Sequence, residues 1–220
     1  MKSMFKFFSV ITAAAVLLSC SVGCNDKESE QNTAGDIKEE ALPFGSTLVS
    51  LDPDTNSNVK IAIDYDDRFI TEEEAIKLSD YVAALNSCDT ELMEKTIYPP
   101  YLSFLAESNG FSTNTEYVQG IYNTIEQNYT GEGFDFNYIV INELFDVNSE
   151  EESDSFSAID SRLKTLNDGD AAPKISSRKM VAIDIYYSID DTGGYQFSKR
   201  FGDDLYLFLY EIDGETYILS

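Results

Sequence analysis

The last third of the chain most constrains the fold, because it contains a very short turn between two alternating strands. Asp213-Gly214 separates the apolar run Leu205–Ile212 from Glu215–Ser220. An Asp-Gly pair in this position is the strongest short-range signal of a two-residue β-hairpin. Upstream, Lys179–Ile189 alternates apolar and polar residues and ends at a second turn, Asp190–Gly194. The chain is therefore predicted to end as an antiparallel meander.

The middle of the chain carries helix signals instead. Thr71 with Glu74, and Thr113 with Glu116, have the spacing of a capping box, which opens a helix. After the first of these boxes, apolar residues recur at three- and four-residue steps, at Ala75, Leu78, Val82 and Leu85. Helices that precede an antiparallel sheet define an α+β arrangement, which is the fold class we expect.

A long apolar strand is predicted between these helices and the meander. Phe134–Val147 is apolar on both alternations, so we expect both of its faces to be covered. Strict alternation would place one set on one face, at Phe134, Phe136, Tyr138 and Val140. It would place the other set opposite, at Ile139, Ile141, Phe145 and Val147.

The first 24 residues have the features of a secretion signal. Lys2 and Lys6 give a positive start, and the uncharged, mainly apolar run Phe7–Leu18 follows. Twelve helical residues span only about 18 Å, which is too short for a hydrocarbon layer of about 30 Å. We therefore expect residues 1–19 to be a cleaved signal peptide.

The end of this signal resembles the lipobox of bacterial lipoproteins. Leu17-Leu18-Ser19-Cys20 has the aliphatic residue three positions before the cysteine, and Ser21-Val22-Gly23-Cys24 has the small residue directly before it. The resemblance implies that a diacylglycerol is attached to Cys20 or Cys24, with Cys20 favoured, and that the protein is extracytoplasmic and anchored to the cell membrane. The alternative is ordinary secretion of a released domain.

Composition separates a tether from a folded domain. Residues 25–42 are polar and acidic with no aromatic residue, too little apolar surface to offset chain entropy. We predict a flexible acidic tether over residues 20–58 and a single α+β domain over residues 59–220. Asp52–Asn58 has oxygen side chains at alternate positions, but it lacks the glycine and the glutamate of a calcium loop, so we interpret it as a turn.

Charge and composition exclude several functions. The chain has 40 acidic and 15 basic residues, giving a formal net charge of −25, and it has no histidine. Loss of Lys2 and Lys6 with the signal would leave 13 basic residues and a charge of −27. Nucleic acid is an unsuitable partner, because phosphate contacts need clustered Lys and Arg. No metal or cofactor motif is present, and sites that depend on histidine are ruled out.

Two segments resemble the NTF2-like domains, related to SnoaL and cystatin folds, that occur in many secreted lipoproteins of Gram-positive bacteria. They are YVAALNSCDTELMEKTIYPPYLSFL at Tyr81–Leu105 and the closing LYEIDGETYIL at Leu209–Leu219. The likeness extends over about Thr71–Ser220 by pattern, without a signature motif. It implies N-terminal helices packed on a curved antiparallel sheet that encloses a cone-shaped cavity, used for catalysis in some members and for binding or dimerisation in others.

The candidate site follows from that fold. In such a cone the polar face of Lys179–Ile189 would bring Asp184 together with other polar and aromatic residues, namely Tyr138, Asn142, Tyr186, Tyr206 and Tyr210. A buried Asp184 beside tyrosines would have a raised pKa and could act as a base. The competing interpretation is that this is the solvent face of the sheet, with the tyrosines serving strand propensity and packing.

Two functional classes remain. The favoured one is a non-enzymatic, anchored domain that binds a peptide, a glycan, a small apolar ligand or a partner protein through a surface rich in Tyr and Phe. The alternative is a small hydrolase or isomerase whose pocket is centred on Asp184. The absence of histidine disfavours the second class, since such pockets usually add a His or Arg partner.

Overall fold

The computed structural model describes residues 42–145, 150–167, 173–201 and 205–219. The chain divides into two units, Met1–Leu42 and Pro43–Ser220, and every helix and strand given below belongs to the second. The predicted signal peptide, Cys20, Cys24 and most of the predicted tether lie outside the described residues.

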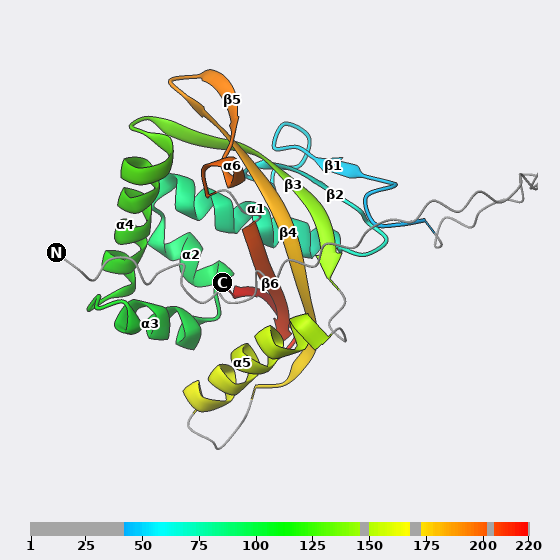
Figure 1. Ribbon diagram of the computed structural model, residues 1–220, viewed down its shortest axis with the longest axis vertical. Helices are drawn as coiled ribbons and strands as arrows, with labels where there is room; N and C mark the ends of the chain where they lie inside the picture. Colours follow the sequence, from blue (N-terminus) through cyan, green and yellow to red (C-terminus); the bar gives the residue numbers. More distant parts are fainter. Residues whose placement is uncertain (1–41, 146–149, 168–172, 202–204, 220) are drawn as a thin grey trace, which may run out of the picture. The chain divides into compact units, whose positions relative to one another are not determined.

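The second unit is an α+β structure with a mostly antiparallel open sheet, so the predicted class is confirmed (Figure 1). The described helices are α1 (Glu72–Ser87), α2 (Thr90–Thr96), α3 (Pro99–Ser108), α4 (Asn114–Ile125), a π-helix η2 (Glu126–Thr130), α5 (Glu150–Leu166) and α6 (Ser198–Phe201). The strands are β1 (Val49–Leu51), β2 (Ala62–Tyr65), β3 (Phe134–Phe145), β4 (Ile175–Ile189), β5 (Thr192–Gln196), β6 (Leu205–Ile212) and β7 (Glu215–Leu219).

The sheet runs in the order β1-β2-β3-β4-β6-β7, and β5 pairs with β4 outside this path. All pairs are antiparallel except β2 with β3, which is parallel. Helix α1 contacts β2 and β3 at one side of this order and β7 at the other. One helix therefore lies against strands that are far apart in the sheet.

Local signals set the helix boundaries. Thr71 caps α1 with both bonds of a capping box: its hydroxyl accepts from the Glu74 amide, and the Glu74 carboxylate accepts from the Thr71 amide. Asp89 caps α2, and Thr113 caps α4 through the Glu116 amide. In α4 the return bond differs from prediction, because the Glu116 carboxylate accepts from the amide of Ser112.

The predicted hairpins form with the expected turn geometry. Asp213 and Gly214 both have positive φ, at 54° and 88°, and Ile212 pairs with Glu215 across the two-residue loop. This geometry matches the right-handed twist of the flanking strands. The Asp190–Gly194 turn is tighter than its predicted length, since Ile189 pairs with Thr192 around Asp190-Asp191 alone.

A register shift in β3 makes its predicted alternation wrong. The pairing with β4 is irregular between Phe136 and Tyr138, so Asn137 is an extra residue in β3. After it the alternation reverses, and the buried residues on β3 are Phe134, Phe136, Ile139 and Ile141. Tyr138 and Val140 are half-buried, so the predicted grouping of Phe136 with Tyr138 fails.

The alternation along β4 divides the sheet into two faces. Ile183 and Ile185 are almost fully buried and pair with Ile141 and Ile139 of β3, and we call this the inner face. Asp184 and Tyr186 point the other way and are half-buried, and we call theirs the outer face. Helix α5 covers one end of the outer face: its Phe156 ring lies 5.4 Å from that of Phe208 and 6.1 Å from that of Tyr210, both on β6.

The folded unit begins earlier than the sequence predicted. Val49–Leu51 pairs with Ile63–Tyr65 as β1 and β2, and the backbone amide of Gly45 donates to the buried carboxylate of Asp66 at 2.9 Å. The polar composition of residues 43–58 reflects turns between short strands and not a tether. The unit therefore starts at Pro43, before the predicted Val59.

Candidate functional site

Two neighbouring rows of side chains cross the outer face of the sheet. In the first row, Ala62, Tyr138, Tyr186 and Gln196 pair in succession across β2, β3, β4 and β5. The Tyr138 and Tyr186 rings lie 5.8 Å apart in a tilted arrangement. In the second row the successive partners are Ser50, Asp64, Val140 and Asp184. A tyrosine pair therefore lies beside two carboxylates.

Asp184 sits in a fixed hydrogen-bond network. The Asn142 side-chain amide donates to Oδ2 at 2.8 Å, and the Ser198 hydroxyl donates to Oδ1 at 2.5 Å. Asn142 reaches Asp184 because it is the extra residue of a second irregularity in β3, between Ile141 and Glu143. Ser198 opens α6 and is itself buried. Donors from two other elements thus hold this carboxylate in place.

The electrostatics of Asp184 contradict the expected base. Burial raises the pKa of this carboxyl, but the hydrogen bonds from Ser198, Gln196 and Asn142 and the charge of Lys199 outweigh burial and lower the pKa below its ordinary value. A carboxylate stabilised in this way is a weak proton acceptor. The prediction of a raised pKa was wrong, because Ser198, Gln196 and Lys199 come from segments whose proximity to Asp184 the sequence does not reveal.

Asp64 is held in a similar way. It accepts hydrogen bonds from the Ser50 hydroxyl at 2.5 Å and from the hydroxyl of Tyr138. Burial, followed by this hydrogen bond and the charge of Asp64, raises the pKa of Tyr138 to about 12. Tyr138 is therefore a neutral donor at physiological pH, and its ring is fixed over β3.

The remaining predicted residues lie on the same face but apart from this group. Tyr206 pairs with Ala182, and its ring contacts that of Phe145 at 5.4 Å between centroids. Tyr210 is fully buried under α5 and donates to Asp160 at 3.1 Å. Tyr210 therefore packs α5 onto the sheet and does not form part of an accessible surface, contrary to prediction. We call the group Asp64, Tyr138, Asn142, Asp184 and Tyr186 the outer patch.

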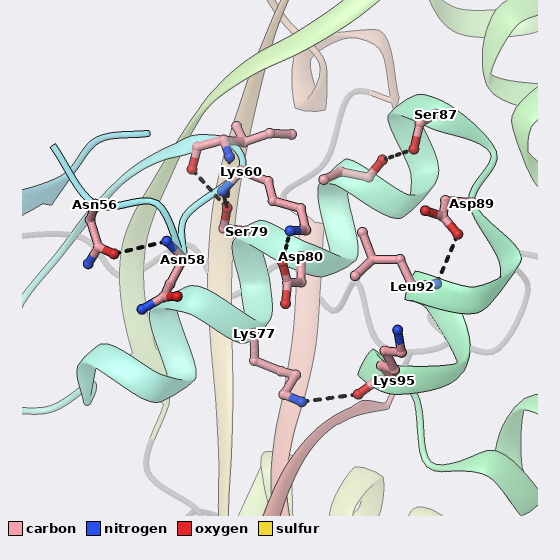
Figure 2. Close-up of polar contacts among 12 residues, drawn as sticks. Asn56, Asn58, Lys60, Lys77, Ser79, Asp80, Ser87, Asp89, Leu92 and Lys95 are labelled. Atoms are coloured by element: carbon pink, nitrogen blue, oxygen red, sulfur yellow. Dashed lines mark hydrogen bonds and ion pairs between the residues drawn. The ribbon is translucent and has the colours of Figure 1, made fainter. Parts of the chain in front are cut away.

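Asp80 on α1 is a feature that the sequence analysis missed (Figure 2). Among the described residues no hydrogen-bond donor reaches its buried Oδ1, and the ammonium of Lys60 forms an ion pair with this atom at 3.6 Å. Burial raises the pKa of Asp80, and the charges of Lys60, Lys77 and Lys95 oppose that shift without cancelling it. The sequence feature that could have indicated this site is Ser79, a polar residue next to the apolar positions of α1.

Ser79 explains why Asp80 is enclosed. Its fully buried hydroxyl accepts from the amides of Lys60 and Ile61, at 3.0 and 2.8 Å, and donates to the Ile61 carbonyl at 3.0 Å (Figure 2). These bonds fasten the segment before β2 to α1. The Lys60–Asp80 ion pair joins the same two segments, because Lys60 precedes β2 and Asp80 lies on α1. We therefore interpret it as part of the contact between them.

A hollow of about 450 Å³ lies beyond this junction, between the segment before β2, the end of α1 and the start of β3. Asn86 is part of its wall. Its amide nitrogen donates to Asp135 at 2.7 Å, and its oxygen accepts from the Phe136 backbone at 2.8 Å. The polar groups of Asn86 are thus occupied in joining α1 to β3, which is a structural role.

Neither a metal site nor a membrane span is found in the part of the chain that the structure describes. No three acidic or cysteine side chains there are grouped so that they could hold a metal ion. Among the same residues, no helix combines the length and the apolar character needed to cross a bilayer.

The chain was compared with protein-family models, with curated proteins and with solved structures, and none of the three comparisons found a match. The outer patch therefore has to be interpreted from its own chemistry.

Proposed function

We propose that this chain is a lipid-anchored extracytoplasmic binding protein, without enzymatic activity, whose folded unit holds a partner on the outer patch. The observation that carries the proposal is the patch itself. Tyr138 and Tyr186 form an aromatic pair, and two hydrogen-bonded carboxylates lie in the next row. Tyrosine supplies large amphipathic contact area at low cost in conformational entropy.

The hydrogen bonding of Asp184 favours binding over catalysis. Both of its oxygens accept bonds from donors of the protein, and its lowered pKa keeps it charged at neutral pH. A general base needs a pKa close to the working pH. A pre-organised carboxylate instead suits recognition, because little entropy is lost when a partner arrives.

The anchored location is supported by the sequence alone. A short positive and apolar N-terminus that ends in Cys20 and Cys24 has the pattern on which lipid attachment depends. Cys20→Ala should release the protein into the medium, whereas Cys24→Ala, the matched control, should leave it in the membrane fraction. Retention of both variants would contradict anchoring through a single cysteine.

An NTF2-like architecture forms part of the proposal. Its support is that α1 contacts β2, β3 and β7, so one helix packs on the sheet from β2 near one edge to β7 at the other. A sheet that curves around α1 accounts for these contacts. In this arrangement the outer patch lies on the convex side and not within the cone.

Site-specific photo-crosslinking tests the binding function. A photo-reactive aromatic residue replaces Tyr186 in the full-length protein on cells, and the same residue replaces the exposed Glu107 of α3 as a control. Adducts of defined mass should form from position 186 only, and Tyr138→Ala should reduce them. Equal adducts from both positions, or none from position 186, would refute the outer patch as a binding surface.

A further inference from the structure

We infer that the outer patch binds an extended peptide segment carrying two positively charged side chains. This inference rests on the proposed function, because it takes the outer patch to be the binding surface and identifies the class of partner. It is carried by the placement of two carboxylates in the row beside a tyrosine pair, together with the charge of the chain.

The two carboxylates have a defined separation. Asp64, Val140 and Asp184 are successive partners across β2, β3 and β4. Neighbouring strands lie about 4.8 Å apart, so the Cα atoms of Asp64 and Asp184 are separated by about 10 Å. Side chains on one side of an extended peptide recur every 6.8 Å or so, and the long stems of Lys or Arg easily span the difference.

Each carboxylate can accept further hydrogen bonds. Asp64 accepts hydrogen bonds from Ser50 and Tyr138, and Asp184 accepts them from Asn142 at Oδ2 and Ser198 at Oδ1, with Gln196 as a further donor. An ionised carboxylate offers about four acceptor positions, so ammonium or guanidinium groups can bind without displacing these donors. The existing bonds fix the direction in which the remaining lone pairs point.

The tyrosine pair supplies the other half of the recognition. Tyr138 and Tyr186 are half-buried, and their rings lie beside the carboxylate row. A cation within about 6 Å of a ring face is attracted to it by the negative face of the ring. The combination of aromatic rings with carboxylates selects cations over anions and over neutral apolar ligands.

The charge of the chain acts in the same direction. At a formal net charge of −25, the protein repels anionic partners and draws cationic segments toward it before contact. A charge within the described part of the chain opposes this attraction, because the Lys199 ammonium lowers the pKa of Asp184. The exposed Lys199 ammonium therefore competes with a cationic partner for Asp184.

The inference is tested with a labelled peptide of alternating arginine and alanine, with the full-length protein in neutral detergent at low ionic strength. Asp64→Asn with Asp184→Asn removes both carboxylate charges, and Glu107→Gln with Glu132→Gln removes two exposed charges elsewhere. Two ion pairs of about 0.5–1 kcal/mol each predict a loss of about 5–30-fold in affinity for the first variant. The second variant should stay within about twofold.

A second pair of variants tests the inference even if the double variant of Asp64 and Asp184 does not fold. Lys199→Gln should tighten peptide binding, because it removes the internal competitor, whereas Lys174→Gln changes the net charge equally and should have little effect. Equal weakening by both acidic double variants would show unspecific attraction and overturn the inference. So would equal tightening by both lysine variants, or an absence of peptide binding.

Competition separates this inference from the proposed function. If the arginine peptide suppresses the adducts formed at position 186, both stand. If adducts form at position 186 and the peptide leaves them unchanged, the outer patch is a binding surface but its partner is not a cationic segment. If no adducts form there, the proposed function itself fails.

Discussion

Lys179 of β4 donates from its ammonium group to the carboxylate of Glu74 in α1 at 2.7 Å. The same ammonium donates to the Phe69 carbonyl at 2.8 Å, just before the helix. Glu74 also accepts from the amide of Thr71, so one carboxylate closes the helix cap and joins the helix to the sheet. The start of α1 is thus positioned by a strand more than a hundred residues later in the chain.

Lys179→Met should therefore destabilise the folded unit. Glu74 is only 11% exposed in its side chain, and removing its partner leaves a poorly solvated charge. We expect a loss of about 1–3 kcal/mol in the free energy of unfolding, measured with urea at neutral pH. Lys174→Met, at an exposed position just before β4, is the control and should change stability by less than about 0.5 kcal/mol. Equal effects would contradict the role of the pair.

Asp66 predicts a loss of stability in acid. It is fully buried, and the hydrogen bond from Arg68 is the main cause that lowers its pKa from 3.8 to about 2. Because the folded-state pKa is the lower one, the stabilisation is present above the unfolded value and is lost as pH falls through about 2. Asp66→Asn should cost about 2–3 kcal/mol at pH 7. The difference from wild type should shrink below pH 4, and a constant difference would refute this assignment.

For Asp80 we predict that stability depends on pH with the opposite sign. Burial raises its pKa in the folded state, so its ionised form destabilises the protein at neutral pH, and the penalty disappears as pH falls toward the unfolded value of 3.8. Asp80→Asn should raise the melting temperature at pH 7, with a smaller gain near pH 4. Glu132→Gln, in an exposed turn, should show no such trend. A lower melting temperature for Asp80→Asn at pH 7 would show that the Lys60 ion pair outweighs the cost of burial.

The elements that sequence reasoning predicted well are those determined within a few residues. The Thr71 capping box and the Asp213-Gly214 turn depend on spacings of two to four positions, and both form as expected. The face assignments in β3 failed because the extra residue Asn137 depends on the pairing with β4. One additional residue reverses the side chains after it, here as far as the second irregularity at Asn142.

The predictions for the candidate site also succeeded where local sequence decides and failed where distant segments decide. Tyr138, Asp184 and Tyr186 were predicted to converge. Asp184 and Tyr186 share one face because strand alternation is local, but Tyr138 joins them only because the extra residue Asn137 shifts the register of β3. The ionisation of Asp184 depends on Ser198, which only the folded chain brings near. The burial of Tyr210 depends on α5, and the enclosure of Asp80 depends on the segment that Ser79 holds.

The two hairpins offer a matched test of turn strain. Asp190 and Asp191 occupy the loop between β4 and β5 with φ of 48° and 59°, whereas the loop between β6 and β7 has glycine at its second position. A residue with a side chain is strained in this left-handed region, and glycine is not. Asp191→Gly should therefore stabilise the protein by about 0.5–1 kcal/mol, after part of the gain is offset by the greater flexibility of glycine in the unfolded chain.

Gly214→Asp is the reverse change at the corresponding position of the other hairpin, where φ is 88°. It introduces the strain that Asp191→Gly removes, so it should destabilise the protein by about 1 kcal/mol or more. Urea unfolding of both variants at neutral pH measures the two effects on one scale. Both changes alter the charge by one unit but in opposite directions, so a purely electrostatic effect is recognised by its loss at high salt. Shifts of the same sign in the two variants would show that backbone conformation does not control either turn.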